Sequence, residues 1–134
     1  MSSLSRWLCT LLLCAWAAAS QAEVAVIVHP ESSISLTPAQ VTNIYLGLDR
    51  SMTPIDLRHW TGTRTHFYQT LVRKNEAQWR SYWATLIFTG KGRPPRGVPD
   101  QAAMLGTIAA DPRAIGYVDT ELLDDRVRVL FILQ

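Results

Sequence analysis

Apolar and polar positions along the chain form two kinds of pattern, one typical of strands and one typical of helices. Short apolar runs that contain β-branched residues predict buried strands at residues 24–28 and 114–118, and a weaker run predicts one at residues 53–57. Alternating apolar side chains between Val127 and Leu133 predict a closing strand. Because helical patterns separate these strands, we expect an α/β fold in which a small mixed sheet has helices on its faces.

Capping residues indicate where the helices begin. Thr37, Pro38 and Gln40 form a strong start, because Thr37 can cap, proline suits the first helical position and Gln40 can reach back to the cap. Gly47 is expected to end this helix. Further helices are expected from about Gly62 to Val72, after Asn75, and after Asp100.

The segment after Asn75 has the clearest amphipathic pattern in the chain. Its large apolar side chains are spaced at i, i+3, i+4, i+7 and i+8: Trp79, Tyr82, Trp83, Leu86 and Ile87. Aromatic side chains at this spacing could stack on a ligand, but one continuous face that contains all five favours packing in the core.

The first 22 residues have the layout of a secretory signal peptide. Arg6 precedes an apolar run from Trp7 to Ala19, and small residues at Ser20 and Ala22 predict cleavage after Ala22. We therefore expect residues 1–22 to be a leader and the protein to be periplasmic or secreted. An uncleaved anchor is the alternative, although the run is short for a membrane-spanning helix, and no later apolar segment is long enough to span a bilayer.

Loss of this leader changes what the composition allows. Both cysteines, Cys9 and Cys14, lie inside it, so the remaining residues offer no disulfide, thiol nucleophile or cysteine-based metal site. Arg6 is one of 13 lysines and arginines, and the others nearly balance the 11 acidic residues. This balance gives no support for a nucleic-acid or membrane-surface binder. The remaining length suits one small domain, at residues 23–134.

The strongest candidate for ligand chemistry is a cluster of hydrogen-bond donors before the apolar helical spacing that starts at Phe67. It consists of Thr61, Gly62, Thr63, Arg64 and Thr65. A helix beginning here would direct unpaired backbone N–H groups, hydroxyls and a guanidinium at one place, which is the chemistry of an oxyanion site. An ordinary helix cap is the alternative, because threonine is common at such positions for structural reasons alone.

Catalytic and metal chemistry find little support in the sequence. His29, His59 and His66 are dispersed and lack the spacing of a zinc site. Neither a nucleophile elbow nor a P-loop is present, and no nucleophile–base pair can be named. We therefore expect a protein that is not an enzyme and has no cofactor.

Several separated segments resemble, in order and spacing, the phosphate-binding component of bacterial ABC phosphate transporters. Three of them are Ile44–Gly47, Arg58–Thr63 with Phe67 following, and Pro112–Val118. A helix that runs into Phe88-Thr89-Gly90-Lys91-Gly92-Arg93-Pro94-Pro95 is similar to the short, single-lobe relatives of that family. The resemblance covers nearly all of residues 23–134. It implies one lobe, about half of a type II periplasmic binding fold.

This resemblance also implies a set of ligand-binding residues. Arg58 resembles the arginine of the family, and Thr61–Thr63 resembles its Ser-Gly-Thr turn. By this likeness, the hydroxyls of Thr61 and Thr63 and the amides of Gly62 and Thr63 would donate to phosphate oxygens, and Arg58 would add a charge-assisted bond. Arg64 is a second cationic candidate by its chemistry, not by the family motif.

Two functional hypotheses follow. The first is a periplasmic, non-enzymatic domain that binds phosphate or a similar oxyanion and works with an ABC phosphate transporter. Because the opposite lobe has no matched positions, we expect weak binding unless a second copy or another protein covers the site. The second is an interaction or sensory partner module that has lost its ligand. It is motivated by that missing half and by residues 90–97, expected to be a basic loop without helix or strand and carrying Lys91, Arg93 and Arg96.

Overall fold

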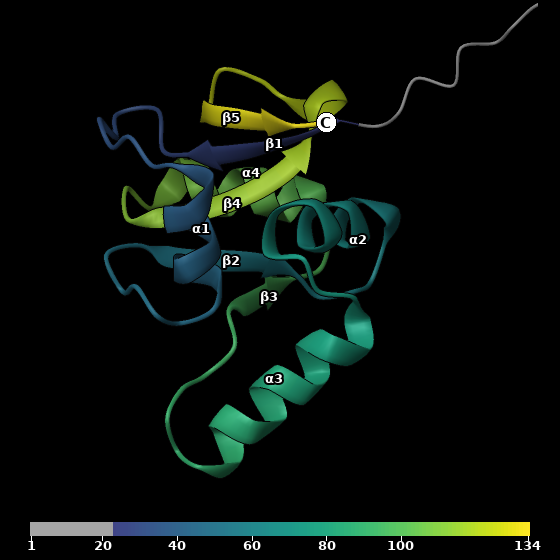
Figure 1. Cartoon of the computed structure of the whole chain (residues 1–134). Helices are drawn as coiled ribbons and strands as arrows, with labels where there is room; N and C mark the ends of the chain where they lie inside the picture. The colour runs from purple at the N-terminus through teal and green to yellow at the C-terminus, as the bar shows by residue number, and fades with distance from the viewer. Residues whose placement is uncertain (1–22) are drawn as a thin grey trace, which may run out of the picture.

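The computed structural model describes residues 23–134, so the expected leader lies outside the described residues. Within them, one mixed sheet has the strand order β3-β2-β4-β1-β5 (Figure 1). Its strands are β1 (Val24–Val28), β2 (Thr53–Leu57), β3 (Arg96–Val98), β4 (Ala114–Asp119) and β5 (Arg128–Leu133). Strand β2 is parallel to β3 and β4, whereas β1 is antiparallel to β4 and β5. The expected α/β fold with a small mixed sheet is therefore confirmed.

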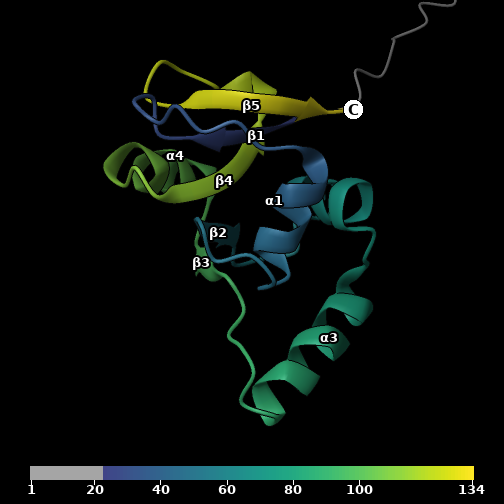
Figure 2. The same cartoon turned by 60° about the vertical axis from the view of Figure 1, so that its left-hand side comes forward.

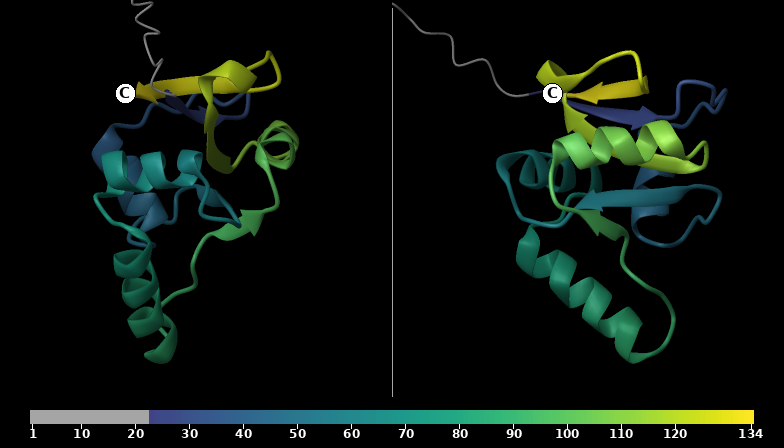
Figure 3. Two further views of the ribbon diagram at one scale, coloured as in Figure 1. Left: turned by 90° about the vertical axis from the view of Figure 1, so that its right-hand side faces the viewer. Right: turned by 180° about the vertical axis from the view of Figure 1, so that it is seen from behind.

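Helices cover both faces of this sheet. They are α1 (Pro38–Tyr45), α2 (Gly62–Phe67), α3 (Glu76–Phe88) and α4 (Gln101–Ala110), with a π-helical segment η2 (Tyr68–Val72) and a 3-10 turn η3 (Thr120–Leu122). Figure 2 and the left panel of Figure 3 show α4 on one face, with α1 and α2 on the other. None of the helices between residues 23 and 134 has the length and apolar character needed to cross a membrane.

Local sequence signals explain where the helices begin and end. The predicted capping boxes at Thr37 and Asn75 are both present, with reciprocal hydrogen bonds between each cap and the glutamine three residues later. The helix expected from Gly62 to Val72 exists as α2, which continues into the wider turns of η2. It stops where Arg73 takes a left-handed conformation at φ 62°.

An aromatic cluster joins α1, α2 and η2 to the sheet. The Phe67 ring stacks on the Tyr117 ring of β4, with ring centroids 4.0 Å apart and planes 7° apart. Tyr45 and Tyr68 meet these rings edge-on, and all four side chains are fully buried. Such aromatic contacts fix the position of α2 against the carboxyl-terminal half of the central strands.

Helix α3 departs from the expected packing because it projects away from the sheet (Figures 1 and 2). Trp79 and Trp83 are buried as predicted, but Tyr82 and Leu86 are only partly buried and Ile87 is 55% exposed. The prediction that all five side chains pack in the core is therefore wrong for the second half of the helix. The pattern shows that one face is apolar, but it does not show how far the rest of the molecule extends along that face.

The expectation that residues 90–97 contain no strand is also wrong. Arg96 and Gly97 begin the short edge strand β3, which pairs with Ile55 and Asp56 of β2. A Cβ atom at Gly97 would lie 3.2 Å from Cα of Arg58. The glycine that suggested a loop therefore allows a close approach of two backbones in the sheet.

Candidate ligand-binding site

The predicted cluster of donors lies where β2 ends and α2 begins. Thr61 has an extended backbone, and its Oγ1 accepts a hydrogen bond from the Arg64 N–H at 3.3 Å, so it caps α2. Thr61 and Gly62 are exposed, and the Gly62 and Thr63 amides occupy the first turn, where a helix supplies no acceptor. The turn therefore combines the ordinary cap with two backbone N–H groups that have no acceptor within the helix.

A second helix begins next to this turn. Strand β3 runs parallel to β2, and Asp100 caps α4 by accepting from the Ala103 N–H at 2.8 Å. A cavity of about 330 Å³ opens between the two helix starts. It is lined by Leu57, His59, Thr61, Pro99, Asp100, Gln101, Ala102 and Leu122. Its position at the carboxyl ends of parallel strands is where open α/β sheets bind ligands.

A polar network ties the first turn of α2 to α4 and β4. The Thr63 hydroxyl donates to Asp119 Oδ1 at 2.9 Å. Gln101 Nε2 donates to Thr63 Oγ1 at 3.2 Å and to Asp119 Oδ2 at 3.0 Å, and Gln101 Oε1 accepts from the Asp119 N–H at 2.7 Å. In this network the Thr63 hydroxyl donates its proton to the Asp119 carboxylate. The network also fixes the starts of α2 and α4 relative to each other.

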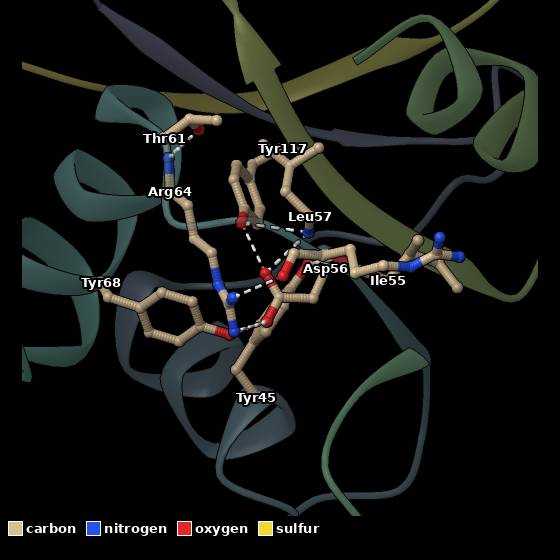
Figure 4. Close-up of polar contacts among 9 residues, drawn as sticks. Tyr45, Ile55, Asp56, Leu57, Thr61, Arg64, Tyr68 and Tyr117 are labelled. Carbon is tan, nitrogen blue, oxygen red and sulfur yellow. Dashed lines mark hydrogen bonds and ion pairs between the residues drawn. The ribbon is translucent and has the colours of Figure 1, made fainter. Parts of the chain in front are cut away.

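Beneath the turn lies a buried ionic cluster centred on Asp56 (Figure 4). Arg64 NH2 contacts Asp56 Oδ2 at 3.1 Å, and the Tyr68 hydroxyl donates to the same oxygen at 2.6 Å. The Tyr117 hydroxyl and the Leu57 N–H donate to Oδ1 of this carboxylate. Asp56 is 2% exposed, so these donors replace the water that a carboxylate would otherwise require.

The pKa values within this cluster reflect burial and the shared negative charge. Burial raises the pKa of the Asp56 carboxyl, although the charge of Arg64 and hydrogen bonds from Tyr117 and Tyr68 oppose that increase. Burial and the Asp56 charge raise the pKa of Tyr45, Tyr68 and Tyr117 well above the ordinary tyrosine value. The tyrosines are therefore hydrogen-bond donors at neutral pH.

Arg64 points into this cluster and is not among the residues that line the cavity. Its NH1 also donates to the Arg58 carbonyl at 3.2 Å, and its guanidinium lies 4.1 Å from the centre of the Trp60 ring. Its Nε is buried without a partner among the described residues. Arg64 therefore holds the residue 58–61 turn against the core, and this geometry disfavours it as a direct ligand.

Arg58 stands apart from the buried cluster. Its backbone N–H donates to the Val98 carbonyl at 2.8 Å, which joins the turn to β3, while the residue as a whole is exposed. The structure thus brings Arg58, Thr61, Gly62 and Thr63 into one turn, but Thr61 is the predicted site residue that lines the cavity, and the other three are not among its lining residues. Among residues 23–134, no three His, Cys, Asp or Glu side chains are grouped as a metal ion would require.

Two residues near the cavity were not indicated by the sequence patterns. Gln101 follows the predicted cap Asp100, and Asp119 follows the buried run of β4. A polar residue directly after an apolar strand is the signal that could have identified Asp119, since strand ends are where sites form. Gln101 has no comparable signal, because the sheet order alone brings it to Thr63.

Comparison with known proteins supports the fold. No protein-family model and no curated protein sequence matches the chain. Similar solved structures include a putative phosphate ABC transporter substrate-binding protein with bound phosphate from Clostridium perfringens (19% identity, TM-score 0.65) and an ABC-type phosphate transport receptor from Vibrio cholerae (16%, 0.63). PstS from Borrelia burgdorferi is a third (15%, 0.57).

These matches show the extent of the shared fold. Each covers 81% of this chain but only 45%, 46% and 47%, respectively, of the other protein. The chain therefore spans less than half the length of these structures. Its sheet and helices match a single lobe of the fold found in periplasmic binding proteins, as the sequence predicted.

Proposed function

We propose that this protein is a periplasmic, non-enzymatic domain that binds phosphate or a similar oxyanion and works with an ABC phosphate transporter. The observation that carries the proposal is the cavity at the carboxyl ends of β2 and β3, where Thr61, the cap of α2, lies beside the first residues of α4. Helix starts of this kind attract anions. The similar solved structures are binding proteins, and the one from Clostridium perfringens has bound phosphate.

The proposed ligand groups are the Gly62 and Thr63 amides, the Thr61 hydroxyl and the Arg58 guanidinium. The backbone amides donate without a charge, and Arg58 adds a charge-assisted bond. Asp100 lines the cavity, and Asp119 accepts from Thr63 beside it. Because these carboxylates repel an anion that has no proton to donate, we propose that phosphate is preferred over sulfate.

Gly62 allows one backbone donor to be removed by itself. It is the first residue of α2, where proline is well tolerated, and Thr61 has the extended conformation that a following proline requires. A Cβ atom at Gly62 would meet nothing within 4 Å. In isothermal titration with phosphate, we expect Gly62→Pro to weaken binding about tenfold while Gly62→Ala, which keeps the N–H, binds like the wild type.

The charge-assisted bond has its own matched pair of variants. Arg58→Gln should weaken phosphate binding about tenfold, because it removes an exposed cation from the turn. Arg113→Gln is the control, since Arg113 is also exposed but precedes β4 at the opposite end of the sheet. Equal binding by both variants would exclude Arg58 from the site.

The alternative function is an interaction or sensory module without a ligand. It predicts no heat of binding with phosphate or sulfate up to millimolar concentrations, in the wild type as well as in Gly62→Pro. A phosphate signal that Gly62→Pro weakens and Gly62→Ala keeps would exclude this alternative.

Export is the remaining part of the proposal, and it concerns residues outside the described part of the chain. We propose that residues 1–22 are a cleaved leader. After expression in a secreting host, the intact mass of the exported protein should correspond to a chain that starts at Glu23. A protein that remains in the cytoplasm at full length would contradict it.

A further inference from the structure

The far end of α3 carries an exposed apolar tip that the proposed phosphate site does not use. We define the α3 tip as Leu48, Ile87 and Phe88, together with the cations Lys91 and Arg93. Phe88 is 92% exposed, Leu48 is 71% exposed and Ile87 is 55% exposed. Leu48 follows α1 but lines the same groove of about 1190 Å³ as Ile87, so the two segments lie together. Figures 1 and 2 show α3 reaching away from the sheet, so its carboxyl-terminal end, at Phe88, lies at an extremity of the fold.

Positive charge surrounds the α3 tip. Residues 77–99 contain four cationic residues and no acidic residue, and one of the four, Arg80, pairs with Glu76 just before this range. Lys91 and Arg93 line the groove with Arg50, and Asp49 is the acidic residue among its lining residues. The near-neutral balance of the whole chain therefore conceals a local excess of cations next to exposed apolar side chains.

We propose that the α3 tip docks on the surface of an anionic phospholipid bilayer. Phe88, Ile87 and Leu48 would enter the region between headgroups and acyl chains, while Lys91 and Arg93 contact lipid phosphates. Each cation near an anionic leaflet strengthens binding about fivefold. The apolar side chains suit the acyl-chain region of such a surface, and the neighbouring cations suit its phosphate layer.

The shape of the tip favours a membrane over a protein partner. A stable protein interface covers about 800 Å² on each side and is built over a broad surface. The α3 tip offers a few exposed apolar side chains, and the helix that carries Ile87 and Phe88 projects away from the sheet. It is also remote from the proposed ligand cavity, because the groove is lined by Thr53 and Pro54 at the start of β2 and the cavity by Leu57 at its end.

The test uses the protein recovered from a secreting host and phosphatidylcholine vesicles with or without phosphatidylglycerol, in buffer free of phosphate. We expect sedimentation with the phosphatidylglycerol vesicles only, and loss of binding at high salt. Ile87→Ser and Phe88→Ser should each lower vesicle affinity about tenfold, because each removes an inserted side chain. Lys91→Gln should lower it about fivefold.

Ile132→Ser is the matched control. The exposed fraction of Ile132, 45%, is similar to the 55% of Ile87. Ile132 lies on β5, however, at the sheet edge opposite β3 and α3 (Figure 1). It should bind vesicles like the wild type. The proposal is overturned if the wild type does not bind phosphatidylglycerol vesicles, or if Ile87→Ser and Ile132→Ser bind these vesicles equally well. If the protein does not bind vesicles but a photocrosslinker at position 88 captures another protein, the α3 tip binds a protein partner instead. None of these outcomes depends on the phosphate site.

Discussion

At the scale of single residues, Asp56 organises the interior below the candidate site. Its carboxylate accepts hydrogen bonds from Tyr68, Tyr117 and the Leu57 amide, and it pairs with Arg64. Arg64 in turn holds the Arg58 carbonyl, so the buried acid also fixes the turn that carries the proposed ligand groups. A buried charge of this kind is tolerated because its partners are all in place.

The first prediction concerns this ion pair. Asp56→Asn should lower the free energy of unfolding by about 3–5 kcal/mol, because it leaves the Arg64 charge buried without a partner. Urea denaturation measures the change. Asp124→Asn is the control, since its pair with Arg126 is exposed on both sides and its loss should change the free energy of unfolding far less. Adding Arg64→Met should recover part of the loss, and strictly additive effects would show that the two residues are not coupled.

The second prediction concerns alkaline pH. Because the folded state raises the pKa of Tyr117, the folded protein retains a proton that the unfolded chain releases above about pH 10. The stabilisation is thus present below that pH and is lost as the pH rises toward the folded pKa. Tyr117→Phe should reduce the pH dependence of unfolding by about 1.4 kcal/mol per pH unit there. Equal slopes for the two proteins would contradict the raised pKa.

At the scale of elements, the sequence predicted those features that depend only on residues close together in the chain, such as the helix caps. The caps at Thr37, Thr61, Asn75 and Asp100 are all present, because each cap is a hydrogen bond within one turn. The exposed end of α3 and the strand β3 could not be predicted, because they depend on which distant segment lies alongside. In the candidate site, too, the features set by local sequence were predicted and those set by distant segments were not.

Within that site, the turn around Gly62 was predicted from its own residues. Gln101 and Asp119 were not, since they meet Thr63 only because β2 lies between β3 and β4. The buried role of Arg64 was missed for a related reason. Its partner Asp56 lies in the preceding strand, and the sequence does not show that both side chains point to the same side.

The third prediction concerns the attachment of α3. The Trp83 ring lies against Gly47, where a Cβ atom would be 3.0 Å from the ring and where φ is +76°. Gly47→Ala should therefore lower the free energy of unfolding by at least about 1–2 kcal/mol. Gly106→Ala is the control within α4, where a Cβ atom meets nothing within 4 Å, and it should stabilise by about 0.5–1 kcal/mol. Thermal unfolding of both variants tests the prediction, and the same direction of change for both would contradict it.

At the scale of the whole molecule, the proposed ligand groups all belong to one turn, between Arg58 and Thr63. Thr61 and Gly62 are exposed, so an ion bound by residues 23–134 at this turn, as proposed, would stay open to water. A helix terminus contributes about 0.3–2 kcal/mol to holding an anion, whereas micromolar binding requires about 8 kcal/mol. Water exposure also weakens the charge-assisted bond from Arg58.

The fourth prediction follows from this open geometry. With a dissociation constant near 1 mM, about 10 mM phosphate should add about 1.4 kcal/mol to the free energy of unfolding and raise the melting temperature by roughly 5 °C. Because a single lobe supplies all the donors, the increase should not depend on protein concentration, and Gly62→Pro should reduce it to about 0.4 kcal/mol while Gly62→Ala keeps it. Sodium chloride at matched ionic strength separates specific binding from screening. A micromolar affinity accompanied by phosphate-dependent dimers in sedimentation would contradict the one-sided site, because a second copy would then be covering the ion.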